Sequence, residues 1–190
     1  MSGLFFIAAG HYSIPISFFT RDPAAIFKSH PFVGIISNIG ILFWCATASI
    51  CFFSFFIIAK QKRKETAWFL LFSGLLTTVL LLDDLLMFHE YIFPEHLHIP
   101  QKAVYVGYLV LTVMFFIRCW KSILQTEYVV LFLACSFFGL STVCDVFLPQ
   151  QGMLIFFEEA FKLFGIVTWT IFFIRTCFTL DRLNVFSDYS

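Results

Sequence analysis

The sequence predicts an all-α protein, a polytopic bundle of transmembrane helices with five spans, or six if residues 3–20 also cross the membrane. Hydrophobic residues make up 60% of the chain and charged residues only 13%, whereas about a quarter of an ordinary soluble domain is charged. The apolar residues form continuous runs of roughly 20 residues, the length of a membrane-spanning helix. These runs also lack the apolar-polar alternation of membrane strands.

Five apolar runs follow one another, separated by short breaks that contain charged residues, proline or glycine. The predicted spans cover residues 32–59, 67–88, 103–120, 128–148 and 153–174. The third run is short, and we expect the long polar side chains at its ends to extend (snorkel) toward the membrane interface. Because the spans use most of the 190 residues, we expect one integral membrane domain over residues 1–190 and no separate aqueous domain.

Residues 1–31 form an N-terminal apolar or interfacial segment. Its apolar run, residues 3–20, contains His11 and Pro15, so it could span, re-enter or lie in the interface. No basic residue precedes this run, which argues against a cleaved signal peptide. We therefore expect the segment to be retained.

Basic residues are concentrated on one side of the predicted bundle. They are Lys60, Lys62, Arg63, Lys64, Arg118, Lys121, Arg175 and Arg182. Under the positive-inside rule this side is cytoplasmic, in an inner or plasma membrane. Most acidic residues then lie toward the outside. The net charge of zero offers no electrostatic footprint for nucleic acid, so the lipid bilayer is the partner that composition predicts.

Two adjacent carboxylates, Asp83 and Asp84, end the second apolar run and are followed by His89 and Glu90. If the helix continues through residue 88, Asp83 and Glu90 are seven residues apart and share one helical face. Ionisable groups at this depth are expensive, face the bundle interior and indicate function. We therefore expect both aspartates to point inward.

Acids of the fourth and fifth spans reach a similar depth. Asp145 follows the small polar residues Ser141 and Thr142, which favour close helix packing. In the fifth span, Lys162 is spaced to pair with Glu158 or Glu159, and the alternative is an acid of the second span. The predicted cation or proton site comprises Asp83, Asp84, Asp145, Glu158, Glu159 and Lys162.

A metal site is a related prediction, because carboxylate and imidazole ligands suit Mn, Fe or Zn. Its candidate ligands are Asp83, Asp84, His89, Glu90 and Glu158, with His96 and His98 in the following loop. The spacing matches no complete ligand motif. His89-Glu90 begins like His-Glu-x-x-His, but Phe93 stands at the second histidine position.

The remaining polar and aromatic residues carry less specific signals. Tyr91, Tyr105 and Tyr108 are predicted to belong to an interfacial aromatic belt. The six cysteines form no Cys-x-x-Cys pair and are expected to be buried free thiols. No Gly-x-Ser-x-Gly sequence or phosphate-binding glycine loop occurs, so whether the protein is an enzyme stays open.

The leading functional hypothesis is a small membrane protein that handles a cation or proton at an acidic, histidine-containing site near the outer side, as a channel or transporter does. A pore would require a homo-oligomer, because one chain has few helices. Two alternatives are a metal-dependent membrane enzyme that acts on lipid or another apolar substrate, and a non-catalytic assembly subunit whose charges only join helices.

Overall fold

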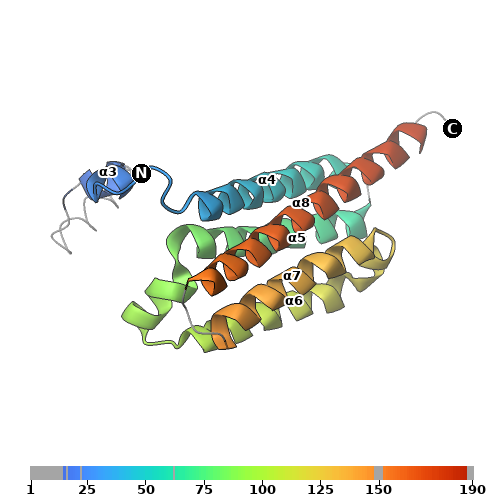
Figure 1. Ribbon diagram of the computed structural model, residues 1–190. Coiled ribbons are helices and arrows are strands. Elements are labelled where there is room, and N and C mark those ends of the chain that lie inside the picture. Colours follow the sequence, from blue (N-terminus) through green and yellow to red (C-terminus); the bar gives the residue numbers. More distant parts are fainter. Residues whose placement is uncertain (1–14, 16, 22, 62, 148–151, 188–190) are drawn as a thin grey trace. The chain divides into compact units, whose positions relative to one another are not determined.

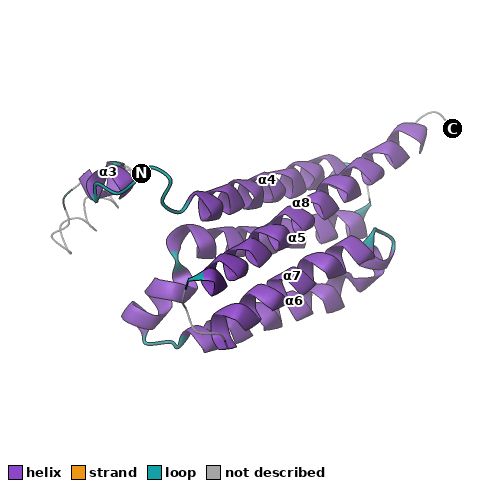
Figure 2. Cartoon of the chain, in the orientation of Figure 1, coloured by secondary structure: helices purple, strands orange, loops and turns teal. Residues whose placement is uncertain are grey.

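The computed structural model describes residues 15, 17–21, 23–61, 63–147 and 152–187, and every regular element in them is a helix (Figure 2). The chain divides into two units, Met1–Ile35 and Ile36–Ser190. The first unit contains two four-residue helices, α2 (Ser17–Thr20) and α3 (Pro23–Ile26). Most of residues 3–20 lies outside the described residues, so a sixth span stays a prediction.

Five long helices build the second unit (Figure 1). They are α4 (Ile35–Ala59), α5 (Lys64–Leu86), α6 (Gln101–Leu124), α7 (Tyr128–Phe147) and α8 (Met153–Ser187). All five are long and apolar enough to cross a membrane, over Met153–Leu180 in the case of α8. The predicted all-α bundle with five spans is therefore confirmed, and α6 is longer than the predicted span at 103–120.

Short connections place successive helices antiparallel and give the bundle two chemically different ends. The Lys60–Arg63 break lies at the start of α5, and the acids Asp83 and Asp84 lie near its end. We call these the basic end and the acidic end. The acidic end also holds a nine-residue π-helix, η1 (Phe88–His96), between α5 and α6.

Aromatic side chains and a few threonines fill the core between the helices. Trp169, Phe172 and Phe173 of α8 are fully buried, and the indole of Trp169 donates a hydrogen bond of 3.1 Å to Thr77 of α5. Such interhelical hydrogen bonds satisfy polar groups that lipid cannot. They fix the rotation of α8 relative to α5.

Helices α7 and α8 lie side by side and make the most extensive interhelical contact in the described bundle (Figure 1). Gly165 of α8 makes room for this approach: a Cβ there would lie only 2.6 Å from Cε1 of Phe138 in α7. Small residues allow helices in lipid to approach closely. The contact holds Asp145 of α7 close to the start of α8, which carries Glu158.

Candidate functional site

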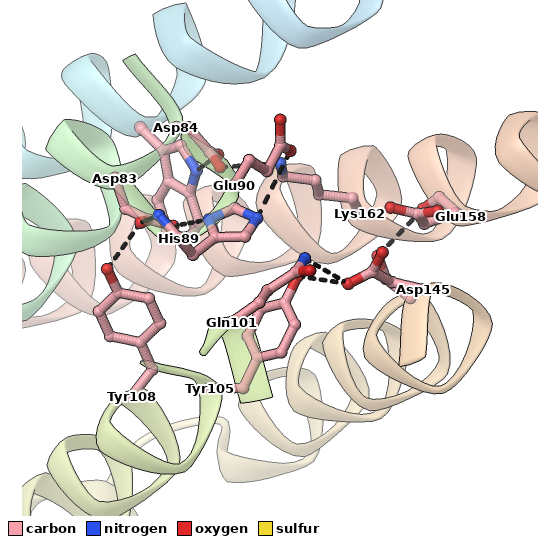
Figure 3. Close-up of polar contacts among 12 residues, drawn as sticks. Asp83, Asp84, His89, Glu90, Gln101, Tyr105, Tyr108, Asp145, Glu158 and Lys162 are labelled. Carbon is pink, nitrogen blue, oxygen red and sulfur yellow. Dashed lines mark hydrogen bonds and ion pairs between the residues drawn. The ribbon is translucent and has the colours of Figure 1, made fainter. Parts of the chain in front are cut away.

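A cavity of about 500 Å³ lies among the five long helices and η1 and reaches from the acidic end into the bundle. Much of its wall is apolar and aromatic, with Phe116, Phe138 and Trp169 among the lining side chains. Its acidic, basic and phenolic lining residues are Asp83, Asp84, His89, Tyr105, Tyr108, Asp145, Glu158 and Lys162. We call this space the acidic cavity, and Figure 3 shows the polar contacts along it.

A break in the second span creates the first part of the site. Helix α5 ends at Leu86, and Met87 adopts the left-handed conformation with φ 51° and ψ 46°, which costs roughly 1–3 kcal/mol for a residue other than glycine. The chain then turns back so that His89 meets Asp83. The His89 backbone N–H donates to Asp83 Oδ1 at 3.0 Å, and Nδ1 lies 2.6 Å from Oδ2.

This break makes one sequence-based expectation wrong. A helix continued through residue 88 would put Asp83 and Glu90 on one face, but the α-helix α5 ends at Leu86. The buried partner of Asp83 is His89, whereas Glu90 is largely exposed and lies 3.5 Å from His89 Nε2. The imidazole therefore lies between a buried carboxylate and a carboxylate at the surface (Figure 3).

The two carboxylates determine the protonation of His89. Burial on its own lowers the pKa of His89, but the hydrogen bonds to Asp83 and Glu90 outweigh it and raise the pKa to about 9. The hydrogen bond from His89 in turn lowers the pKa of Glu90. At neutral pH His89 is thus an imidazolium that donates from both ring nitrogens.

Asp84 forms an ion pair between helices. Its Oδ1 lies 2.8 Å from Nζ of Lys162 in α8, and its Oδ2 accepts a hydrogen bond of 2.7 Å from the Trp44 indole of α4. The sequence offered two kinds of partner for Lys162, Glu158 or Glu159 in its own helix and an acid of the second span; the structure shows the latter. Glu159 lies partly buried and lines a small pocket with Asp84 and Lys162.

Asp145 anchors the third part of the site. Its Oδ2 accepts hydrogen bonds from the Tyr105 hydroxyl at 2.6 Å and from the Gln101 amide at 3.0 Å, both from α6. Figure 3 shows the Asp145 and Glu158 side chains pointing toward each other from α7 and α8. The expected inward direction of Asp145 is therefore confirmed.

Two tyrosines of the predicted interfacial belt also form part of the site. Tyr105 and Tyr108 were expected in an interfacial belt, but their hydroxyls donate to Asp145 and Asp83, each at 2.6 Å. Gln101, Tyr105 and Tyr108 stand at positions i, i+4 and i+7 of α6, so they share one helical face. That spacing was the signal that could have identified them.

The described residues contain no group of three or more His, Cys, Asp or Glu side chains arranged to hold a metal ion. His96 and His98 are exposed, and neither lines the acidic cavity. The carboxylate oxygens of Asp83 already contact His89 and Tyr108. Those of Asp84 contact Trp44 and Lys162. Binding of Mn, Fe or Zn stays a prediction.

Taken together, the site is a cavity lined by both acid-base groups and aromatic groups. Four carboxylic acids, Asp83, Asp84, Asp145 and Glu158, and two bases, His89 and Lys162, line it. Even with both bases protonated, ionised acids would outnumber them by two.

Comparison with known proteins gives a family and no activity. No curated protein and no solved structure matches the chain. A family model matches residues 2–176, which is most of the 190 residues. The chain therefore belongs to the family described as a domain of unknown function (DUF8692).

Proposed function

We propose that this membrane protein binds and transfers protons or another cation in the acidic cavity. The observation that carries the proposal is the excess of carboxylic acids over bases among the residues that line the cavity. The cavity walls lie within the bundle, where an excess of ionised carboxylates is costly unless it is neutralised. Protons and other cations can both neutralise this excess negative charge, and loss of either returns the cavity to its charged state.

A chain of polar groups links the cavity wall to the bundle surface. Glu90 is largely exposed, His89 lies beside it, and Asp83 and Tyr108 follow within hydrogen-bond distance of one another. Histidine exchanges protons readily with neighbouring carboxylates, and such positioned groups serve as acid and base in proton transfer. Glu90, His89 and Asp83 thus offer a route for protons into the cavity.

Asp145 and Glu158 are the residues that we expect to hold the transported charge. They reach the cavity from two different helices and point toward each other (Figure 3). Two ionised carboxylates at such a site repel, and a shared proton or a cation between them relieves the repulsion. The Tyr105 and Gln101 donors hold Asp145 in place for this exchange.

The concentration of Lys and Arg at the basic end orients this site. Under the positive-inside rule the basic end is cytoplasmic, and the acidic cavity then opens toward the outside of an inner or plasma membrane. Five helices are few for a pore inside one chain, so a symmetric homo-oligomer is part of the proposal.

Proton flux into liposomes tests the function. The purified protein is reconstituted with a pH-sensitive dye inside, and a potassium gradient with valinomycin sets the membrane potential. The wild-type protein should raise proton flux above that of protein-free liposomes, and Glu158→Gln should lower the added flux at least about tenfold because the amide cannot carry the charge.

Glu95→Gln is the matched control, because Glu95 is an exposed acid of the acidic end that does not line the cavity. It should keep the wild-type flux. Melting temperatures of all three proteins establish that they are folded. A wild-type flux no greater than that of empty liposomes, or an equal flux from folded Glu158→Gln, would contradict the proposal.

One observation favours a second function, a membrane enzyme acting on lipid or another apolar substrate. Much of the cavity wall is aromatic and apolar, including Phe116, Phe138 and Trp169, and apolar cavities with a few convergent polar groups are typical ligand sites. Stoichiometric metal in the purified protein together with no proton flux would favour this enzyme. If the purified, folded protein shows neither bound metal nor proton flux, the third alternative is favoured, an assembly subunit whose charges only join helices.

A further inference from the structure

A second pocket of about 340 Å³ lies at the basic end and shares no lining residue with the acidic cavity. The start of α5, the connection between α6 and α7 and the C-terminal part of α8 enclose it. We call it the basic-end pocket; its polar lining includes Arg63, Thr66, Ser122, Gln125, Arg175 and Thr176. It plays no part in the function proposed above.

One buried hydroxyl in this pocket lacks a hydrogen-bond partner. Thr176 is only 4% exposed, and its Oγ1 has no partner among the described residues. Three other threonines of α8 donate back to a carbonyl one turn earlier, at 2.7–2.9 Å: Thr168 to Phe164, Thr170 to Ile166 and Thr179 to Arg175. A buried hydroxyl without a partner is destabilising, so rotation of the Thr176 side chain toward an acceptor bound in the pocket would recover a lost interaction.

The charge of this pocket is opposite to that of the acidic cavity. Arg63 and Arg175 line it, and Glu127 is the one acid among its lining residues. Glu127 Oε1 lies 2.6 Å from Arg175 Nη2. Arginine has five N–H donors, so Arg175 can hold Glu127 and still donate to a second anionic group.

The start of α5 adds a further attraction for an anion. Arg63 is the N-cap residue, and no side chain caps the helix there. The first backbone N–H groups of a helix point outward and carry the positive end of its dipole, which makes them suited to phosphate. Thr66, in the first turn of α5, lines the pocket.

We propose that the basic-end pocket binds a phosphate-bearing anion between Arg63 and Arg175, with the Thr176 hydroxyl donating to the bound group. The end of a transmembrane bundle is the depth of lipid headgroups, and basic pockets between helices there bind anionic ones. Exposed Trp68 of α5 and Trp120 of α6 lie at this end, as interfacial tryptophans do. The headgroup phosphate of an anionic lipid is therefore the expected ligand.

Thermal unfolding of the full chain in detergent tests this site with three probes: phosphatidylglycerol, phosphatidylcholine and inorganic phosphate. Phosphatidylglycerol should raise the melting temperature by about 5 °C, since a ligand that binds the folded state stabilises it. Phosphatidylcholine should have little effect. A shift with inorganic phosphate as large as with phosphatidylglycerol identifies free phosphate as the source, and no shift with either anion overturns the proposal.

Variants locate the effect in the pocket. Thr176→Val keeps the shape without the hydroxyl, so the protein should stay folded while its anion-induced shift falls by about half or more. Arg63→Gln should lower the shift similarly, and Arg118→Gln, an exposed arginine of α6 outside the pocket, should leave it unchanged. An unchanged shift in Thr176→Val, or equal losses in Arg63→Gln and Arg118→Gln, overturns the assignment.

Discussion

Each end of the bundle has an ion pair that joins α8 to another segment, α5 at the acidic end and the α6–α7 connection at the basic end. The two pairs differ in their surroundings far more than in their geometry. Lys162 and Asp84 lie 2.8 Å apart with side chains 22% and 8% exposed. Arg175 and Glu127 lie 2.6 Å apart with side chains 58% and 47% exposed. Distance alone would rank the pairs as equal. Burial separates them, because water can replace a lost partner only at the basic end.

Breaking the buried pair should have the largest effect on stability. Lys162→Met leaves Asp84 with the Trp44 indole as its remaining partner, and an uncompensated buried charge destabilises a protein by roughly 3–5 kcal/mol. Unfolding in mixed detergent micelles with increasing dodecyl sulfate would measure the loss against the wild-type protein.

The double variant Lys162→Met/Asp84→Asn is the control for this experiment. It removes both charges, so it should recover much of the stability that Lys162→Met loses. A double variant as unstable as the single one would mean that Lys162 acts through packing, and the contrast between the two ends would then not be electrostatic.

The His89–Asp83 pair should show its contribution as a pH dependence. The pKa of folded His89, about 9, lies above its ordinary value of 6.5, so its contribution is fully present below pH 6.5 and is lost as the pH rises through 9. The shift corresponds to about 3 kcal/mol at most. The stability difference between wild type and His89→Gln should therefore be largest near pH 6 and shrink by about pH 9.5.

The same unfolding assay at a series of pH values measures this difference. His96→Gln serves as the matched control, because His96 is an exposed histidine of the same π-helix and its replacement should change the stability little. A His89→Gln difference that stays constant over the whole range would show that the imidazole does not gain a proton on folding.

Breaking the exposed pair should have the smallest effect. Glu127→Gln removes the charge beside Arg175 at the basic end, and exposed pairs contribute about 0–1 kcal/mol. Asp84→Asn makes the same replacement of a carboxylate by its amide in the buried pair. Measuring the two variants side by side therefore compares the buried and the exposed ion pair directly. A loss with Glu127→Gln as large as with Asp84→Asn would show that the basic end is not open to water.

The sequence predicted the elements of the fold and the position of the acids along their helices, because both follow from local composition. A charged break such as Lys60–Lys64 ends a span wherever the span packs, and Asp83 and Asp84 lie near the end of α5 however that helix is rotated. The all-α bundle, its five long helices and the inward direction of Asp145 were accessible in this way.

The partners of each acid were not accessible from the sequence, because they depend on one backbone break and on the rotation of helices about their axes. Periodicity placed Asp83 with Glu90, and only the left-handed turn at Met87 brings His89 onto Asp83 instead. Lys162 had acids within reach on its own helix, and the packing of α8 against α5 turned it to Asp84. Hydropathy predicts where along a helix a side chain lies. The hydrogen-bond partner of that side chain depends on which neighbouring helix it faces, and only tertiary packing decides this.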